Sequence, residues 1–225
     1  MLAVGTFNWI DDLSPDARAA VLARARVKAL ADGTILYRQG DITTDLFQIV
    51  VGEIRKYVLT PDGQEVLLYI YGAGDVVADS SAIDRDPYPV TISTRGAARL
   101  RFWSVEDFAE LRQAFTEIDS LLALQMSRRL RGALLLAQEL VTLDASARVA
   151  ARIAALTDLQ GSVRRDQPIA LSQSDLGLMV GITRQSVNQI LNELKALQLI
   201  DAHYGRITVR DLTGLKLYAA RSRKP

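Results

Sequence analysis

The segment 183–189 carries side chains whose chemistry suits the reading of nucleic-acid bases. A guanidinium can donate two hydrogen bonds to guanine, and a carboxamide pairs best with adenine. The residues that we expect to read bases in this way are Arg184, Gln185, Asn188 and Gln189. Hydroxyl groups suit phosphate contacts instead, and there we expect Thr183 and Ser186. The predicted chemistry is recognition of double-stranded DNA.

Two short helices joined at Gly181 would position these side chains. Ser172 suits the N-cap of the first helix, with Asp175 at the capping-box position, and Gly181 supplies the left-handed geometry that ends it. Thr183 caps the second helix. Its apolar residues recur at helical spacing and are Val187, Ile190, Leu191 and Leu194. The pattern predicts a helix-turn-helix with the polar side chains facing outward; a generic polar helix face is the alternative.

A β-hairpin is expected after this pair of helices. Leu199–Ala202 and Ile207–Arg210 read as its strands, with a turn at Tyr204 and Gly205 between them. Such a hairpin is the wing of a winged helix. Expected phosphate contacts are Arg206 and Arg210 in the wing, and Arg164 and Arg165 in the polar loop at 161–167. For each arginine, a solvated surface charge is the alternative.

Composition excludes several chemistries. The 225 residues are 49% hydrophobic, which supports a real core, and they include no cysteine and one histidine, His203. Disulfides, thiol redox sensing, cysteine-ligated iron–sulfur clusters and multi-histidine metal sites are therefore not expected. The same counts argue against a metalloenzyme built on a small β-barrel. We expect neither enzyme activity nor a cofactor.

Charge is unevenly distributed along the chain. Residues 1–115 contain 12 Lys and Arg against 16 Asp and Glu, whereas residues 145–225 contain 12 against 6. A basic C-terminal third agrees with DNA binding there, although ordinary fluctuation in charge is the alternative. No run approaches the ~20 apolar residues that span a bilayer, and the N-terminus lacks a signal-peptide pattern. We therefore expect a soluble protein of the cytoplasm with no membrane partner.

The N-terminal half reads as a β-rich domain after one helix. Ser14-Pro15-Asp16 opens that helix, which we expect to continue over Ala17–Ala29. Short β-branched or aromatic runs follow, with turn residues between them, including Gly52. The expected strands are Thr34–Arg38, Leu46–Val51, Ile54–Leu59, Glu65–Tyr71, Pro89–Ser93 and Leu100–Trp103. Many short strands at this spacing predict a small barrel or jelly-roll-like sandwich.

One long helix is expected over Phe115–Leu143. It is apolar on more than one face, so it must be buried on more than one face. It would pack on its own domain and on the same helix of a second chain; a helix wholly inside one chain's core is the alternative. The expected dimer interface is Leu122, Met126, Ala133, Ala137 and Leu140. Asp144 marks the expected hinge, and Ala145–Leu159 the next helix. The predicted α+β fold has a β-roll sensor domain over 1–115, a dimerisation helix over 116–144 and a winged helix-turn-helix over 145–225.

With both halves in view, the chain resembles the Crp/Fnr family of bacterial transcription regulators from about Gly33 to Tyr218. The run LQMSRRL at Leu124–Leu130 looks like the family's dimerisation helix, and ITRQSVNQIL at Ile182–Leu191 looks like its recognition helix. The glycines that fit the family's β-roll are Gly40, Gly52, Gly63 and Gly74. The resemblance implies a homodimer that binds palindromic DNA, acts with RNA polymerase and responds to an effector held in the β-roll.

The chain departs from the family where cyclic nucleotides bind. The family's phosphate cassette has Phe-Gly-Glu-Leu and, several residues later, Arg; here Ala78, Asp79 and Tyr88 stand for its Gly, Glu and Arg. A phenol cannot reproduce the charge-assisted contact of Arg. On the long helix, Ala133 and Leu134 stand where the family places Thr and Ser against adenine. Charged hydrogen bonds contribute about 1.5–3 kcal/mol each, so tight cyclic AMP binding is not expected.

Other effectors of the family fit no better. Its oxygen-sensing branch needs clustered cysteines, and its haem-binding branch needs ligands in the sensor, whereas His203 falls in the wing as a phosphate contact or solvent-exposed residue. An unidentified non-nucleotide small molecule, or no effector, remains. Residues that could line an altered pocket are Tyr69, Tyr71, Asp79, Tyr88, Thr91, Ala133 and Leu134. For the tyrosines, packing in the core or on the surface is the alternative.

The leading hypothesis is a homodimeric, sequence-specific DNA-binding regulator. Gln185 and Gln189 replace Glu and Arg of the family's recognition helix, so we expect a different half-site. The alternative is a cyclic-nucleotide-binding regulatory module that acts on protein partners, with the helix-turn-helix used only for packing.

Overall fold

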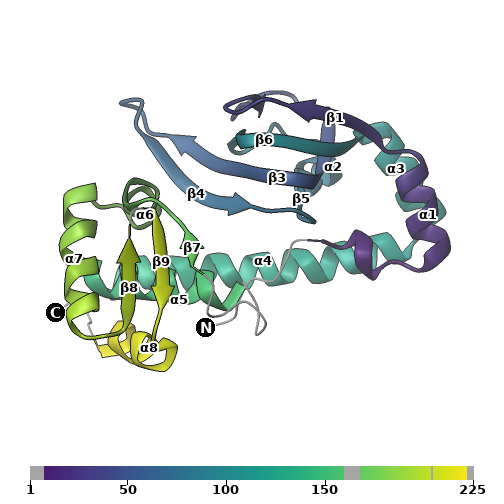
Figure 1. Ribbon diagram of the computed structural model, residues 1–225. Helices are drawn as coiled ribbons and strands as arrows, with labels where there is room; N and C mark the ends of the chain where they lie inside the picture. The colour runs from purple at the N-terminus through teal and green to yellow at the C-terminus, as the bar shows by residue number, and fades with distance from the viewer. Residues whose placement is uncertain (1–7, 160–167, 204, 222–225) are drawn as a thin grey trace. The chain divides into compact units, whose positions relative to one another are not determined.

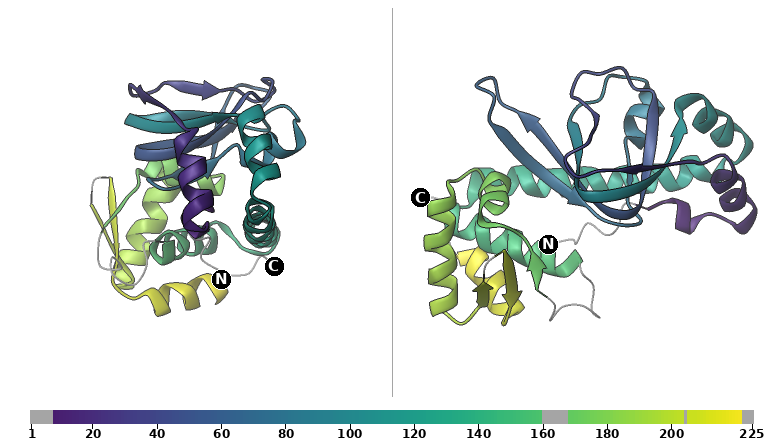
Figure 2. Two further views of the ribbon diagram at one scale, coloured as in Figure 1. Left: turned by 90° about the vertical axis from the view of Figure 1, so that its right-hand side faces the viewer. Right: turned by 45° about the horizontal axis from the view of Figure 1, so that its top comes forward.

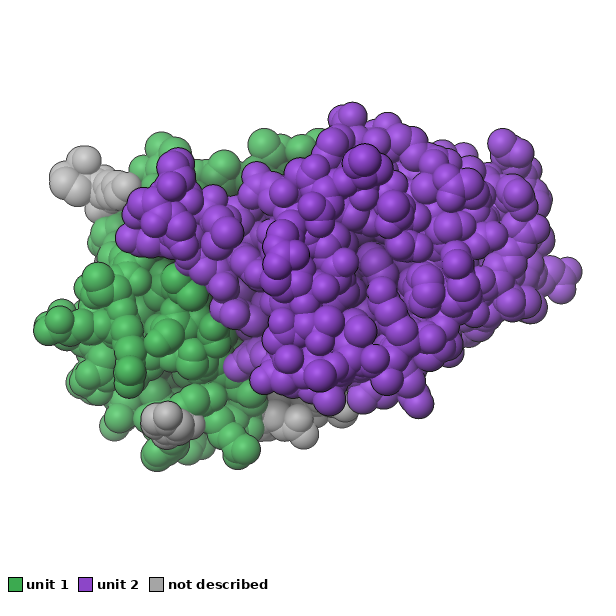
Figure 3. All heavy atoms as spheres, turned by 90° about the horizontal axis from the view of Figure 1, so that it is seen from above, with its two compact units in different colours: residues 1–5, 130–225 green, residues 6–129 purple. Residues whose placement is uncertain are grey.

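The computed structural model describes residues 8–159, 168–203 and 205–221 and contains both helices and sheets (Figure 1). The chain forms two compact units, coloured separately in Figure 3. The described residues up to Arg129 form one unit, and those from Leu130 onward form the other. They are called the sensor unit and the DNA unit below, after the roles that the sequence leads us to expect. The predicted mixed α/β fold, with a β-rich N-terminal part, a long helix and a C-terminal helix-turn-helix, is confirmed.

A curved antiparallel sheet forms the body of the sensor unit (Figures 1 and 2). Its strand order is β1-β6-β3-β4, while β2 pairs with β6 and β5 pairs with β3. The strands are β1 (Arg26–Leu30), β2 (Ile35–Tyr37), β3 (Asp45–Leu59), β4 (Glu65–Tyr71), β5 (Val76–Val77) and β6 (Thr91–Ser104). Because β3 pairs with both β4 and β6, residues far apart in sequence meet across the sheet.

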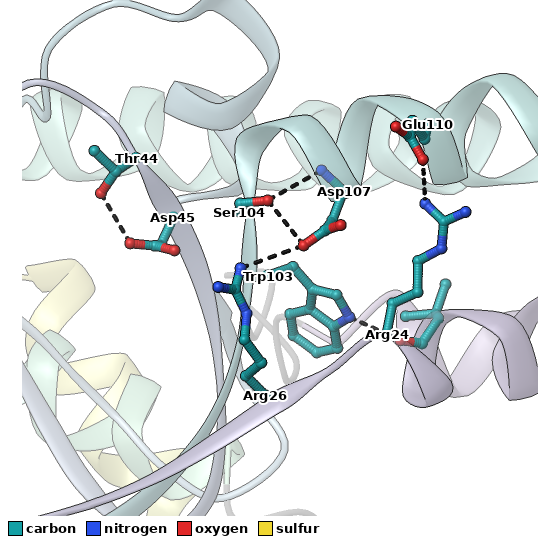
Figure 4. Close-up of polar contacts among 9 residues, drawn as sticks. Arg24, Arg26, Thr44, Asp45, Trp103, Ser104, Asp107 and Glu110 are labelled. Carbon is teal, nitrogen blue, oxygen red and sulfur yellow. Dashed lines mark hydrogen bonds and ion pairs between the residues drawn. The ribbon is translucent and has the colours of Figure 1, made fainter.

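Helices of the sensor unit close one end of its core. They are the 3₁₀ turn η1 (Ile10–Asp12), α1 (Pro15–Ala23), α2 (Asp79–Asp84), α3 (Val105–Ala114) and the first part of α4 (Glu117–Thr142). Trp9 and Trp103 lie in one buried cluster with Phe108 of α3 and Leu122 of α4. The Trp103 indole donates to the Val21 carbonyl at 2.7 Å (Figure 4). This buried hydrogen bond joins β6 to α1.

Three expectations for the sensor unit are wrong. The helix expected over Ala17–Ala29 ends at Ala23, and Arg26–Leu30 forms β1, which pairs with Phe102–Ala98 of β6. Pairing with a distant strand overrides the local helical pattern. Gly52 is not a turn between two strands either. It lies inside β3, where the register with β6 shifts between Val51 and Glu53. The strands expected over Pro89–Ser93 and Leu100–Trp103 are not separate either, because residues 91–93 and Leu100–Trp103 belong to the single strand β6, which begins at Thr91.

The register shift at Gly52 leads to a testable prediction. Gly52 has φ +98°, and a Cβ there would lie 2.7 Å from the Ala97 oxygen; Gly63 has φ +82° and no neighbour within 4 Å. Both Gly→Ala variants strain the backbone, but only Gly52→Ala also collides with β6. We expect Gly52→Ala to lower the free energy of unfolding by about 1–3 kcal/mol more than Gly63→Ala, because overpacking costs that much. Urea unfolding followed by circular dichroism measures the difference, and equal losses would contradict it.

The DNA unit contains a helix-turn-helix followed by a hairpin. Its elements after α4 are α5 (Ala145–Leu159), β7 (Ile169–Ala170), α6 (Gln173–Val180), α7 (Arg184–Ala196), β8 (Ile200–His203), β9 (Arg206–Val209) and α8 (Leu212–Arg221). Strands β7, β9 and β8 form one sheet in that order. Asp144 accepts from the Ala147 amide at 2.9 Å and so begins α5. Among the described helices, none combines the length and the apolarity needed to cross a membrane.

Candidate DNA interface and effector site

Local capping fixes the two helices of the motif. Ser172 Oγ accepts from the Asp175 amide at 3.0 Å at the start of α6, and Thr183 Oγ1 accepts from the Ser186 amide at 3.1 Å at the start of α7. Gly181 ends α6 with φ 71°, a left-handed conformation that costs glycine little. These residues are the caps that the sequence predicts. Because α7 begins immediately after this turn, its first turns are held at a fixed orientation to α6.

The outer face of α7 carries the predicted base-reading set. Val187, Leu191 and Leu194 are buried, which orients the helix on the core of the DNA unit. The side chains that remain exposed include all four predicted readers, Arg184, Gln185, Asn188 and Gln189. Asn188 Oδ1 accepts a hydrogen bond from the side-chain Nε2 of Gln173 at 3.1 Å, and this contact links α7 to α6. We call α7 the recognition helix.

A groove of about 380 Å³ adjoins the start of the recognition helix. It is lined by the first residues of α6, by Arg184 and by the wing; the lining residues are Ser172, Gln173, Ser174, Arg184, Ala202, His203 and Gly205. A helix N-terminus and a guanidinium on one groove favour a negatively charged group. His203, in the wing as expected, is exposed beside this groove.

The predicted phosphate contacts are in different environments. Arg210 Nε donates to Asp201 Oδ2 at 2.6 Å, so its charge is paired within the wing. Arg206 is exposed and has no carboxylate partner in the part of the chain that the structure describes. The hydroxyls of Thr183 and Ser186 lie 2.9 Å apart and hydrogen-bond to one another. Arg164, Arg165 and Tyr204 lie outside the described residues.

A buried carboxylate marks the interior of the sensor unit. Asp79 has an exposed fraction of 0%, and Arg129 Nη1 donates to its Oδ1 at 2.5 Å. Gln125 Nε2 donates to its Oδ2 at 2.9 Å, and Arg129 also donates to the Val76 carbonyl at 3.0 Å. Although burial disfavours a charged guanidinium, the charge of Asp79 and its hydrogen bond outweigh it, so the pKa of Arg129 is raised. Helix α4 is thereby tied to the segment 76–79.

Lys56 of β3 and Tyr71 of β4 lie close to this ion pair. Lys56 Nζ donates to Tyr71 Oη at 3.5 Å, and burial together with the nearby charge of Arg129 lowers the pKa of Lys56 despite Asp79. Burial also raises the pKa of Tyr71. We call Lys56, Tyr71, Asp79, Gln125 and Arg129 the inner polar cluster.

The sequence predicted Tyr71 and Asp79 at this site, but it did not predict Lys56, Gln125 and Arg129. A signal for Lys56 was present in the sequence. Lys56 lies two residues after the buried Ile54 on the same strand, and a charged side chain on the buried face of a strand is unusual. Arg129 lies within LQMSRRL, where the pattern indicated only the dimerisation helix. Neither signal reveals its partner, because Arg129 and Asp79 are 50 residues apart.

The other predicted pocket residues have structural roles or lie elsewhere. The Tyr88 hydroxyl accepts from the Asp45 amide at 3.0 Å and donates to the Asp45 carbonyl at 2.8 Å. Its ring stacks on Tyr37, with centroids 3.7 Å apart. Thr91 accepts from the Gln39 amide at 3.0 Å. Tyr69 lies beside Tyr71, with ring centroids 4.8 Å apart. Ala133 and Leu134 belong to the DNA unit and are exposed.

The predicted dimer interface divides into two parts. Leu122 packs in the sensor unit's own core with Trp9 and Phe108, so this residue is not available to a second chain, and its assignment to the interface is wrong. Met126 is half-buried. In the second part of α4 several apolar side chains are exposed. This apolar stripe consists of Leu130, Ala133, Leu134, Ala137, Leu140 and Val141.

Within the described residues there is no group of three or more His, Cys, Asp or Glu side chains able to hold a metal ion.

Both units match models of known protein families. The model of the cyclic nucleotide-binding domain matches residues 27–115, and the model of the Crp-like helix-turn-helix domain matches residues 147–218. The cAMP-activated global transcriptional regulator CRP of Haemophilus influenzae is 26% identical over 182 residues, which cover 80% of this chain and 81% of that protein. The anaerobic regulatory protein of the same organism is 25% identical over 200 residues, covering 84% of this chain and 75% of that protein.

Solved structures show the same fold. The c-di-GMP-responsive global regulator CLP of Xanthomonas campestris superposes with a TM-score of 0.73 at 22% identity. The match covers 87% of this chain and 99% of that chain. The names of these proteins give two different effectors, cAMP and c-di-GMP. One fold therefore serves proteins with different effectors, so the comparisons assign no effector to this chain.

Proposed function

We infer the function of this chain from its membership of the Crp/Fnr family of DNA-binding transcription regulators. We propose that it is a homodimer that binds palindromic DNA. An effector other than cyclic AMP would control this binding. RNA polymerase is the proposed partner at the promoter. The observation that carries the proposal is the outward set Arg184, Gln185, Asn188 and Gln189 on a capped recognition helix beside an anion-favouring groove. Side chains of these types on the first turns of such a helix reach base edges in the major groove.

The apolar stripe supports a homodimer. Leu130, Leu134 and Val141 are 62%, 62% and 75% exposed in the single chain, and the stripe repeats at three- and four-residue intervals. Such a seam suits packing against a parallel copy of the same helix, with small Ala133 and Ala137 allowing close approach. A two-fold dimer of this kind would place two recognition helices in successive major grooves about 34 Å apart.

The environment of Tyr88 supports an effector other than cyclic AMP. This residue stands where the family's cassette has Arg, and its hydroxyl is already engaged by the backbone of Asp45. No cation is supplied at that position. The sequence has no cysteine to hold an iron–sulfur cluster, and its single histidine lies in the wing, so the sensor unit offers neither a cysteine nor a histidine ligand to haem.

Selection of DNA from a random pool, with and without cyclic AMP, tests the proposal. An enriched palindrome in both samples supports it, because DNA binding then does not need this nucleotide. Enrichment only with cyclic AMP would overturn the effector part. If neither sample is enriched, selection is repeated with a metabolite extract; continued failure would favour a module that acts on protein partners.

Arg184→Ala tests the recognition helix on the selected site. We expect specific binding to weaken about 10- to 100-fold, with relaxed preference at one base position, because a bidentate contact to guanine is lost. Arg206→Ala is the matched variant. Loss of a phosphate contact should weaken binding to all sequences alike and reduce the salt slope by about 1. Quantitative gel shifts at several salt concentrations distinguish the two, and unchanged base preference in Arg184→Ala would contradict its reading role.

A further inference from the structure

The ammonium group of Lys56 is poorly neutralised in the structure. Its single hydrogen-bond partner among the described residues is Tyr71 Oη, at 3.5 Å, which is long for a lysine donor. An ammonium has three donors to satisfy, and burial of a charge that lacks a close partner is costly. The position therefore favours an additional acceptor with negative charge.

The carboxylate whose charge acts on Lys56 is already engaged by other donors. Asp79 Oδ1 accepts from Arg129 and from the Ser80 amide at 3.0 Å, and its Oδ2 accepts from Gln125. The charge of Asp75 raises the pKa values of Arg129 and Tyr71, and Asp75 Oδ2 accepts a hydrogen bond from the Gly72 backbone amide at 2.9 Å. Lys56 therefore experiences both the repulsion of Arg129 and the attraction of Asp79, but among the described residues its ammonium group makes no hydrogen bond to a carboxylate.

Strand geometry places an aromatic surface next to Lys56. Lys56 of β3 is directly opposite Tyr69 of β4, and Tyr71 is two residues further along the same strand. Residues two apart on a strand share a face, and the Tyr69 and Tyr71 rings are 4.8 Å apart. Lys56 Nζ also lies 5.9 Å from the centre of the Tyr71 ring.

We propose that Lys56 and Arg129 bind the oxyanion group of a small organic effector, a carboxylate or a phosphate, whose body packs on Tyr69. This assignment rests on the proposed function, because it names the ligand class of the same sensor unit. It differs from the family's cassette in position. The cation is supplied by β3, opposite Tyr69, rather than by the residue that Tyr88 replaces.

Calorimetric titration with inorganic phosphate and, separately, with benzoate tests the proposal at constant ionic strength set with chloride. We expect saturable binding of at least one probe at millimolar concentration or below. Lys56→Met should weaken it at least about tenfold, because a charge-assisted hydrogen bond is lost. Lys56→Arg retains the charge and should bind within a fewfold of the wild type. The probe that binds distinguishes phosphate from carboxylate chemistry.

Lys28→Met is the matched control. Lys28 is also a partly buried lysine with a pKa lowered by burial, but its Nζ lies over the Phe47 and Phe102 rings at 4.7 and 4.9 Å. We expect this variant to bind the probe as the wild type does. Equal weakening in both Met variants would overturn the inference, because the effect would then be one of general charge.

Parallel gel shifts on the selected palindrome separate this inference from the proposed function. Lys56→Met should bind DNA like the wild type when no anion is present, which also shows that it folds. If the wild type binds neither probe saturably, the inference is overturned whatever the DNA result. If a probe binds in a Lys56-dependent way but no DNA is bound, the anion site stands and the proposed function fails.

Discussion

Arg129→Met is expected to destabilise the sensor unit by about 3–5 kcal/mol, because it removes one partner of a buried ion pair and leaves the other charge behind. Asp79 is fully buried, and Arg129 supplies the guanidinium that holds it, with an exposed fraction of 21% for its side chain. Methionine keeps much of the length of the side chain, so the loss reflects charge and hydrogen bonding more than packing. Hydrogen exchange of the β3 and β6 amides reports the change in the free energy of opening.

Two further variants make this prediction specific. Asp79→Asn combined with Arg129→Met should be more stable than Arg129→Met alone, because no buried charge then remains unpaired. Arg24→Met removes a cation from an exposed ion pair, Arg24–Glu110, in the same unit (Figure 4). Exposed pairs contribute about 0–1 kcal/mol, so this control should change little. If Arg129→Met cost no more than Arg24→Met, the buried pair would not be a major source of stability.

Leu134→Glu is expected to dissociate the proposed homodimer and to abolish tight binding to a palindromic site. In a two-fold interface one substitution introduces two charges, and burial of unpaired charges costs several kcal/mol. We expect the dissociation constant of the dimer to rise at least about 100-fold, which is about 2.8 kcal/mol. Sedimentation velocity measures the oligomeric state, and gel shifts on full and half palindromes measure DNA binding.

Leu217→Glu provides the control for this experiment. Leu217 lies on α8 of the same unit and is 52% exposed, against 62% for Leu134. The same chemical change outside the apolar stripe should leave the dimer and its DNA binding intact. A monomeric wild type, or a Leu134→Glu variant that still dimerises, would refute the stripe as the interface.

Features that depend on nearby residues were predictable from the sequence. Ser172, Gly181 and Thr183 act on amides or turns within three residues of themselves, and all three cap as expected. The recognition helix begins directly after the predicted cap Thr183 and ends two residues after Leu194, the last residue of its apolar pattern. The expected readers of DNA are therefore exposed on a predicted element.

Features that depend on distant partners were not predictable. Arg26–Leu30 resembles a continuation of α1, and it is a strand because Ala98–Phe102 lies beside it. Gly52 resembles a turn residue, yet it accommodates the close approach of β6 at Ala97. In the same way, Asp79 gives no local indication that Arg129 is its partner. In each case a residue 45 or more positions away determines the structure.

The buried indoles give the protein a built-in optical probe of one unit. The chain has two tryptophans, and both Trp9 and Trp103 belong to the sensor unit's core cluster. Their emission should shift to longer wavelength when that core opens, and it is insensitive to melting of the DNA unit, which has no indole. Far-ultraviolet circular dichroism follows both units together. Recording the two signals in one titration therefore distinguishes an effector that stabilises the sensor unit alone from one that couples the two unfolding transitions.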